Sequence, residues 1–280
     1  MRCRYREKIY RTGEYLEVDI FPVFHKGGTG SRRKAKYKPT SAMQARLNQR
    51  RAEEALTRLL NENFTDDDIE ITLTYDDEHL PSDCDKAFRD ADNYIRRVKR
   101  LRGKRGLSEL KFCKVLGGGR FHFHIVMSGG IDRDELERMW GLGYANSKRL
   151  KFSSGGVAGL AHYIANQLDA SDEFGGEDLF SLYDIDVETG EATEKPRERK
   201  KGQRRWSCSK NLRRPAPEIR EGRISAGKVE ELATFDAESR AVYEKLYPGY
   251  EFVSARPYYN PENGGYYLQV RMRSIKRRIN

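Results

Sequence analysis

Two histidines two residues apart are the residues whose type and spacing most directly indicate chemistry in this chain. His122 and His124 lie in the apolar, β-branched run 121–127, which is typical of a β-strand. Side chains at i and i+2 of a strand point to the same face, so both imidazoles are expected to project together. Neutral imidazole is the commonest protein ligand for divalent metals, which predicts a two-point metal site. Two half-exposed strand histidines without a function are the alternative, because any one-sided strand alternates polar and apolar residues.

Composition narrows the classes of partner. The 280 residues carry a formal net charge of +10 and a pI near 9.3, so polyanions are the expected partners and nucleic acid leads among them. No run of 18 apolar residues and no secretory signal occurs, and we expect no membrane association. The cysteines lie far apart without Cys-x-x-Cys spacing, which argues against a zinc ribbon and favours a reducing, cytoplasmic location.

The elements expected to position the histidines lie between residues 69 and 168. In chain order they are a strand at 69–75, a helix at 85–102, strands at 110–116 and 121–127, a helix at 132–140, a strand at 148–152 and a helix at about 156–168. This order predicts an α+β fold, an antiparallel sheet with helices on one face. The opposite face, to which both histidines would point, is expected to stay open to a ligand.

Four successive segments are expected along the chain. Residues 1–65 hold a strand at 15–24, a basic glycine-rich loop and a helix, all packing on the core at 66–170. Residues 171–203 form a charged linker or insertion, and residues 204–280 a basic and aromatic region with short strands. Residues 171–194 hold nine carboxylates and no lysine or arginine, whereas residues 195–214 hold ten basic residues and one glutamate. Opposed charge blocks of this kind indicate a surface connection.

Basic side chains in several of these segments are the expected phosphate contacts, because counterion release makes such charges the main source of affinity for nucleic acid. They are Lys34, Lys36, Lys38, Arg96, Arg97, Arg100, Arg120, Arg204 and Arg205.

Three motifs occur in the order found in one superfamily of enzymes. They are Ile71-Thr72-Leu73-Thr74-Tyr75 with its acidic turn, His122-Phe123-His124, and Tyr163 on a helix. The chain resembles the rolling-circle replication initiators of the HUH endonuclease superfamily, and more closely their plasmid and phage-type Rep proteins. The run 48–51 (Asn-Gln-Arg-Arg) and the basic run 204–212 are similar to further segments of those proteins.

The resemblance implies a specific reaction on single-stranded or stem-loop origin DNA. A divalent metal, Mn²⁺ or Mg²⁺, held by His122 and His124 would polarise the scissile phosphate. Tyr163 would attack the phosphorus and leave a 5′-phosphotyrosyl link with a free 3′-OH that primes replication. A host helicase and polymerase are then expected as further partners.

Two departures from the family pattern bear on this expectation. The strand before the histidines holds no carboxylate where the family commonly has a glutamate, and Asn166 stands where the family often has a lysine. Gln167 lies four residues after Tyr163, hence on the same helix face, and is the expected third metal ligand through its amide oxygen. The competing hypothesis is a catalytically silent protein that binds single-stranded nucleic acid by stacking and charge on the same fold.

Overall fold

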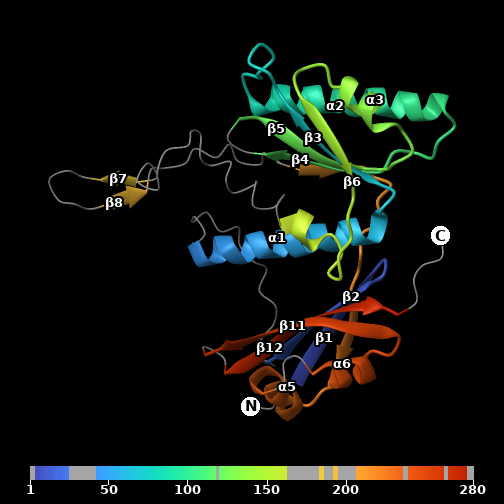
Figure 1. Ribbon diagram of the computed structural model, residues 1–280. Coiled ribbons are helices and arrows are strands. Elements are labelled where there is room, and N and C mark those ends of the chain that lie inside the picture. The colour runs from blue at the N-terminus through green and yellow to red at the C-terminus, as the bar shows by residue number, and fades with distance from the viewer. Residues whose placement is uncertain are drawn as a thin grey trace. The chain divides into compact units, whose positions relative to one another are not determined.

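Segments from both ends of the chain combine into one unit, and most of the middle of the chain belongs to a second (Figure 1). The computed structural model describes residues 4–24, 42–117, 120–162, 183–185, 192–194, 206–235, 239–261 and 264–275. Unit 1 comprises residues 1–65, 151–161 and 213–280, and unit 2 comprises residues 66–150 and 162–212. The first 65 residues therefore share a unit with the carboxy-terminal region, whereas the sequence predicts four successive segments. Both main sheets are antiparallel and carry helices, which confirms the predicted α+β class.

Unit 2 is built on a five-stranded antiparallel sheet in the order β6-β3-β5-β4-β9. The strands are β3 (Ile69–Thr74), β4 (Phe112–Gly117), β5 (His122–Met127), β6 (Ala145–Arg149) and β9 (Trp206–Cys208). The predicted hairpin is present, with β5 paired to β4 on one side and to β3 on the other. Strand β6 lies three residues earlier than the sequence predicts, and the short edge strand β9 comes from the basic segment that follows residue 203.

Helices α2 (Cys84–Lys104) and α3 (Arg133–Arg138) pack on one face of this sheet. Each begins at an aspartate whose side chain accepts a hydrogen bond from a main-chain amide of the first turn, as is usual for an N-cap. Buried residues of α2 recur at helical spacing, namely Ala87, Ala91, Tyr94, Ile95 and Val98. They pack against apolar side chains of the sheet, and burial of each large one contributes roughly 1.5–3 kcal/mol.

The pairing register decides which side chains of the sheet face these helices. Ile71 lies opposite Ile125 and Leu73 opposite Phe123, and all four are buried in the core beneath α2 and α3. Because successive residues of a strand alternate between faces, the intervening His122 and His124 point to the other face. The predicted same-face placement of the two imidazoles, away from the helices, is confirmed.

Unit 1 is built on a second five-stranded antiparallel sheet, in the order β10-β1-β2-β12-β11. Its strands are β1 (Arg4–Thr12), β2 (Tyr15–Val23), β10 (Glu218–Glu221), β11 (Tyr250–Asn260) and β12 (Gly265–Ser274). Helix α1 (Ala42–Asn63) covers one face, and α5 (Ala226–Thr234) and α6 (Arg240–Leu246) cover the other. The sequence predicts neither β1 nor the helices α5 and α6. The carboxy-terminal strands β11 and β12 span 11 and 10 residues and are not short.

Two further observations complete the described chain. In the segment predicted as a charged linker, β7 (Tyr183–Ile185) pairs with β8 (Ala192–Glu194) as a small antiparallel ladder. None of the helices in the described ranges combines the length and apolar character needed to cross a membrane.

Candidate metal and nucleic-acid site

The two imidazoles of β5 lie side by side, with ring centroids 5.0 Å apart and ring planes nearly perpendicular. Nδ1 of His122 is 2.9 Å from the carbonyl oxygen of Arg120. A carbonyl only accepts hydrogen bonds, so the proton of a neutral His122 belongs on Nδ1, which leaves the lone pair of Nε2 for a ligand. Nδ1 of His124 is 3.2 Å from Oγ1 of Thr72, a partner that permits the same tautomer. Partners of this kind on the second nitrogen orient metal-binding histidines.

A glycine provides the space for the first of these rings. Gly117, the last residue of β4, pairs with His122 across the hairpin. A Cβ atom at Gly117 would lie 2.1 Å from Nε2 of His122, which no real contact permits. The imidazole therefore lies directly over the glycine, and any larger residue at this position would displace the ring.

The surroundings of His124 keep it neutral. Its side chain is buried, with 2% of its surface exposed. Burial, the neighbouring His122 and the positive charge of Lys148 together lower the pKa of His124 from 6.5 to about 4. At neutral pH the ring is therefore uncharged, which is the form that binds a metal.

Glu70 and Lys148 are charged neighbours of the pair that sequence reasoning missed. Oε1 of Glu70 lies 3.9 Å from Nδ1 of His124, and Oε2 lies 3.3 Å from the ammonium of Lys148. Burial raises the pKa of Glu70, and Lys148 opposes that effect. Because Glu70 approaches the nitrogen that also faces Thr72, its geometry suits an outer partner of the imidazole and not a direct metal ligand. Alternation along β3 marks Glu70 as facing the same side as Thr72, but the register that brings it to His124 is not visible in the sequence.

The predicted open face is closed over the inner histidine. Val115 and Val126, which flank His124 on this face, are 2% and 1% exposed. Towards the other end of β5 the side chains become accessible, since His122 and Thr74 are both partly exposed. A ligand would therefore reach the pair from the end of the sheet where His122 lies, with His124 as the inner group.

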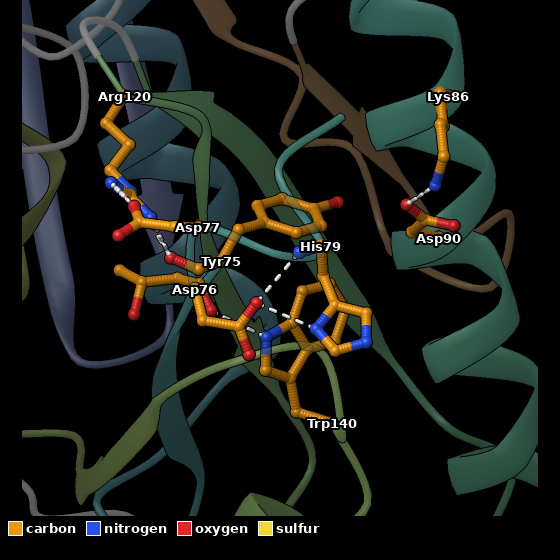
Figure 2. Close-up of polar contacts among 9 residues, drawn as sticks. Tyr75, Asp76, Asp77, His79, Lys86, Asp90, Arg120 and Trp140 are labelled. Carbon is orange, nitrogen blue, oxygen red and sulfur yellow. Dashed lines mark hydrogen bonds and ion pairs between the residues drawn. The ribbon is translucent and has the colours of Figure 1, made fainter. Parts of the chain in front are cut away.

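The turn after β3 follows Thr74, which is paired with His122, and therefore lies at this end of the sheet. Figure 2 shows the polar contacts of the turn. Arg120 donates through Nε and Nη2 to the carbonyl oxygen of Tyr75, and its Nη1 lies 2.7 Å from a carboxylate oxygen of Asp77. In the same turn, Oδ1 of Asp76 accepts from the main-chain N–H of His79 and lies 2.7 Å from Nδ1 of its ring. These two bonds lower the pKa of Asp76. The exposed ion pair of Arg120 contributes little to stability, so the guanidinium can exchange its carboxylate partner for a phosphate.

Two exposed aromatic side chains flank the histidines on the same face. Tyr144, 67% exposed, pairs with Thr74 through the main chain just before β6. Trp206, 46% exposed, lies opposite Val115 on β9. Each is two strands away from β5, which corresponds to about 10 Å on either side at the usual strand spacing. Exposed rings at this spacing are suited to stacking on nucleic-acid bases.

Several predicted site residues lie outside the residues that the structure describes. They are the proposed nucleophile Tyr163, the proposed ligand Gln167, and the predicted phosphate contacts Lys34, Lys36, Lys38, Arg204 and Arg205. The helix predicted for Tyr163 is described over residues 158–162. These assignments remain predictions.

Three other predicted phosphate contacts lie on α2 and not beside the histidines. Arg96, Arg97 and Arg100 belong to the helix that packs on the opposite face of the sheet. Arg97 is engaged within the protein, because its Nη2 donates to the carbonyl oxygens of Met139 and Trp140. Of the predicted basic residues that are described, only Arg120 borders the His-bearing face.

The donor set of the pair fits a divalent ion. Two imidazoles on one rigid strand, each with a partner at Nδ1, can provide two nitrogen ligands and leave further positions for water or a phosphate oxygen. Among the described residues, no group of three or more histidine, cysteine, aspartate or glutamate side chains is placed to hold a metal. A third protein ligand would therefore be of another type or come from another part of the chain, as predicted for Gln167.

Comparisons with known proteins add no relative. No protein-family model matches the chain, and neither the curated proteins nor the solved structures contain a match.

Proposed function

We propose that this protein is a metal-dependent DNA-nicking enzyme that initiates rolling-circle replication, and that it acts in the cytoplasm on single-stranded or stem-loop origin DNA. The observation that carries the proposal is the pair His122 and His124, two adjacent imidazoles on one strand, the outer of them lying over Gly117. A protein that only stacks and neutralises nucleic acid has no need of this arrangement. A host helicase would unwind the duplex and a host polymerase would extend the strand from the free 3′-OH.

The chemical step that we propose is a transesterification. The phenolic oxygen of Tyr163 forms a bond to the scissile phosphorus while the bond from phosphorus to the 3′ oxygen breaks. The tyrosine proton passes to a base in solution, and the departing 3′ oxygen takes up a proton. One phosphoester bond replaces another, so no nucleoside triphosphate is consumed and the step can run backwards to rejoin strands.

The residues around the pair have separate parts in this proposal. His122 and His124 would hold Mn²⁺ or Mg²⁺ through their Nε2 atoms, with Gln167 as the proposed third ligand. When bound, the ion supplies Lewis-acid polarisation of the scissile phosphate. Arg120 and Lys148, both substantially exposed at this face, would neutralise the phosphates of the bound strand.

The decisive experiment follows a label from DNA to protein. A randomised pool of single-stranded DNA, labelled at the 3′ end, is incubated with the protein and Mn²⁺, and adducts are resolved on a denaturing gel. The wild-type protein should acquire the label, whereas a pool labelled at the 5′ end should transfer none, because the tyrosine retains the 5′-phosphate side. Tyr163→Phe should form no adduct yet bind DNA with nearly unchanged affinity, because only the nucleophilic oxygen is removed.

Tyr144→Phe is the matched control, because Tyr144 is an exposed tyrosine on the His-bearing face. This variant should form the adduct as the wild type does. An adduct with Tyr163→Phe would transfer the role to Tyr144 or Tyr183 and contradict the assignment. Whichever tyrosine forms the adduct, addition of EDTA should abolish it, because the proposed reaction depends on the metal.

The second candidate is a binding protein without catalysis. The exposed rings of Tyr144 and Trp206 at either side of the pair favour it, because stacking alone would use them. It predicts tight binding of single-stranded DNA with no adduct from any variant in any metal. Under that candidate, replacing both rings with alanine should weaken binding, while His122→Ala should have little effect.

A further inference from the structure

A small pocket in unit 1 lies outside the site described above. Its volume is about 260 Å³, and it opens between β1, the end of β2, the start of α5 and the turn of the β11–β12 hairpin. Its lining consists of four aromatic residues, one carboxylate and three small residues: Tyr5, Phe24, Tyr259, Tyr266, Glu230, Ala226, Gly264 and Gly265.

The aromatic wall is held by the fold. Tyr5 belongs to the core of unit 1, and its hydroxyl accepts a hydrogen bond of 3.2 Å from the main-chain N–H of Tyr266. Tyr259 and Tyr266 are paired across the hairpin with ring centroids 4.9 Å apart. Tyr259 is 49% exposed, so part of its ring is accessible to a ligand. The wall is therefore largely preformed, which reduces the entropy lost on binding.

Size and charge restrict the ligand. A volume of about 260 Å³ is below the range of roughly 300–1,000 Å³ that holds drug-sized molecules, so a single ring system fits. Among the described residues that line the pocket, Glu230 is the only charged one, and no lysine or arginine accompanies it. A carboxylate repels phosphate, so the pocket suits a flat, uncharged ring with N–H donors on its edge.

The chain next to the pocket favours a nucleic-acid source for that ring. Phe24 leads in the sequence into the basic run 25–38, which holds Lys26, Arg32, Arg33, Lys34, Lys36 and Lys38. Residues 25–38 lie outside the described part of the chain, so only their sequence bears on this point: basic residues that follow a base-binding pocket along a chain are suited to contact the phosphates on either side of the bound base. A cationic group of a protein partner would meet the same ring wall but would be repelled by a chain of net charge +10.

We propose that this pocket binds one unstacked base of single-stranded DNA and prefers guanine. The Watson–Crick edge of guanine presents two adjacent N–H donors, which a carboxylate such as that of Glu230 can accept together. Cytosine and adenine each offer one amino group, and thymine places carbonyl oxygens beside its single N–H. The pocket would thus give the proposed nicking reaction a preference for certain DNA sequences. This inference rests on the proposed function only in taking single-stranded DNA as the ligand.

The test measures binding of oligothymidylate tracts that carry one central dG, dA, dC or dT, by fluorescence anisotropy with the full chain in EDTA. The wild type should bind the dG tract several-fold more tightly than the dT tract. Tyr259→Ala should weaken binding of the dG tract about tenfold, within the range for loss of one base–aromatic stack. Glu230→Gln should abolish the preference for dG without weakening binding of the dT tract.

Matched controls come from neighbouring positions. Tyr258, 59% exposed, faces the opposite side of the same strand, and Glu231 is paired with Lys228 on α5. Tyr258→Ala and Glu231→Gln should both keep the preference for dG. Equal effects of Tyr258→Ala and Tyr259→Ala, or equal binding of the four tracts by the wild type, would overturn the proposal.

Two further measurements separate this proposal from others. In the first, tetramethylammonium is added to the wild type and to Tyr259→Ala. If it displaces the dG tract from the wild type alone, the pocket binds a cationic side chain and the proposal is overturned. His122→Ala separates it from the proposed function, because this variant should lose adduct formation and retain the preference for dG. A protein that forms no adduct but prefers dG would contradict the nicking proposal alone.

Discussion

The two sheets of this protein differ in what they bury beside their paired charges. In unit 1, Arg58 of α1 lies 2.9 Å from Glu17 and 3.1 Å from Asp19, and its guanidinium is 3.8 Å from the ring centre of Tyr10. In unit 2, the face opposite the helices also buries a carboxylate, Glu70, with Lys148 as its partner, but beside them lie two imidazoles whose Nδ1 atoms face uncharged groups, the carbonyl of Arg120 and the hydroxyl of Thr72. A buried charge must be paired, whereas a neutral imidazole keeps a lone pair for a ligand. The ion pairs of Arg58 therefore serve to hold α1 on its sheet, whereas the imidazole pair is able to bind a ligand.

The largest expected effect concerns the stability of unit 1. Arg58→Ala leaves Glu17, 3% exposed, as a buried carboxylate without its guanidinium. Loss of one partner of a buried pair costs about 3–5 kcal/mol, which urea unfolding and amide exchange in unit 1 would detect. The double variant Arg58→Ala with Glu17→Gln should recover part of this loss, because it removes the stranded charge. A cost below about 1 kcal/mol, typical of an exposed pair, would contradict the structural role assigned to Arg58.

A smaller effect is expected at the glycine under the outer imidazole. Gly117→Ala places a methyl group where Nε2 of His122 now lies and should displace the ring. Adduct formation should fall about 10- to 100-fold, the usual effect of disturbing the support of a metal ligand, and recover partly at high Mn²⁺. Gly103→Ala on α2 is the control, because a Cβ there meets nothing within 4 Å. Equal activity of the two variants would show that the position of His122 is unimportant.

The smallest expected effect is a difference between the two units in how the free energy of unfolding depends on pH. The pKa of His124 is lowered to about 4 in the folded state, so the unfolded chain binds more protons between pH 6.5 and 4. The free energy of unfolding therefore has its full value with respect to His124 above pH 6.5. It falls on acidification below that pH, by at most about 1.4 kcal/mol per pH unit. Burial raises the pKa of Glu17 and of Asp19 even though Arg58 opposes it, so acidification should favour folded unit 1 through these groups.

Amide exchange at pH 7, 6 and 5 in EDTA would resolve the two units separately. The raised pKa of Glu70 opposes the effect of His124 in unit 2, but unit 1 has two such carboxylates and no histidine of this kind among its described residues, so acidification should still destabilise unit 2 more than unit 1. His124→Asn should reduce the slope for unit 2 alone. An NMR titration of His124 with a midpoint close to 6.5 would contradict this prediction.

Much of unit 2 could be predicted from local pattern. The alternation of β3 and β5, the glycine-rich turn between β4 and β5 and the apolar spacing of α2 each depend on residues near one another in the chain. Unit 1 was predicted only in part: β2, α1 and strands near the carboxy terminus were expected, whereas β1, α5 and α6 were missed. The union of both ends of the chain in one sheet depends on pairings more than 200 residues apart, β1 with β10 and β2 with β12, and α5 and α6 are short. Short helices carry weak periodic signals, and their burial against β12 and β11 stabilises them.

The sequence by itself determined that His122 and His124 share a face, because the period of two is a property of every strand. Only the tertiary structure decided what lies beside them. The register of β5 against β3 and β4 brings Thr72, Glu70 and Gly117 to the imidazoles, and the pairing of β4 with β9 brings Sγ of Cys208 to 2.8 Å from Sγ of Cys113. A slip of one residue in any of these pairings would exchange the two faces of a strand. Register depends on which distant segments bury their apolar faces together, and no local pattern contains that information.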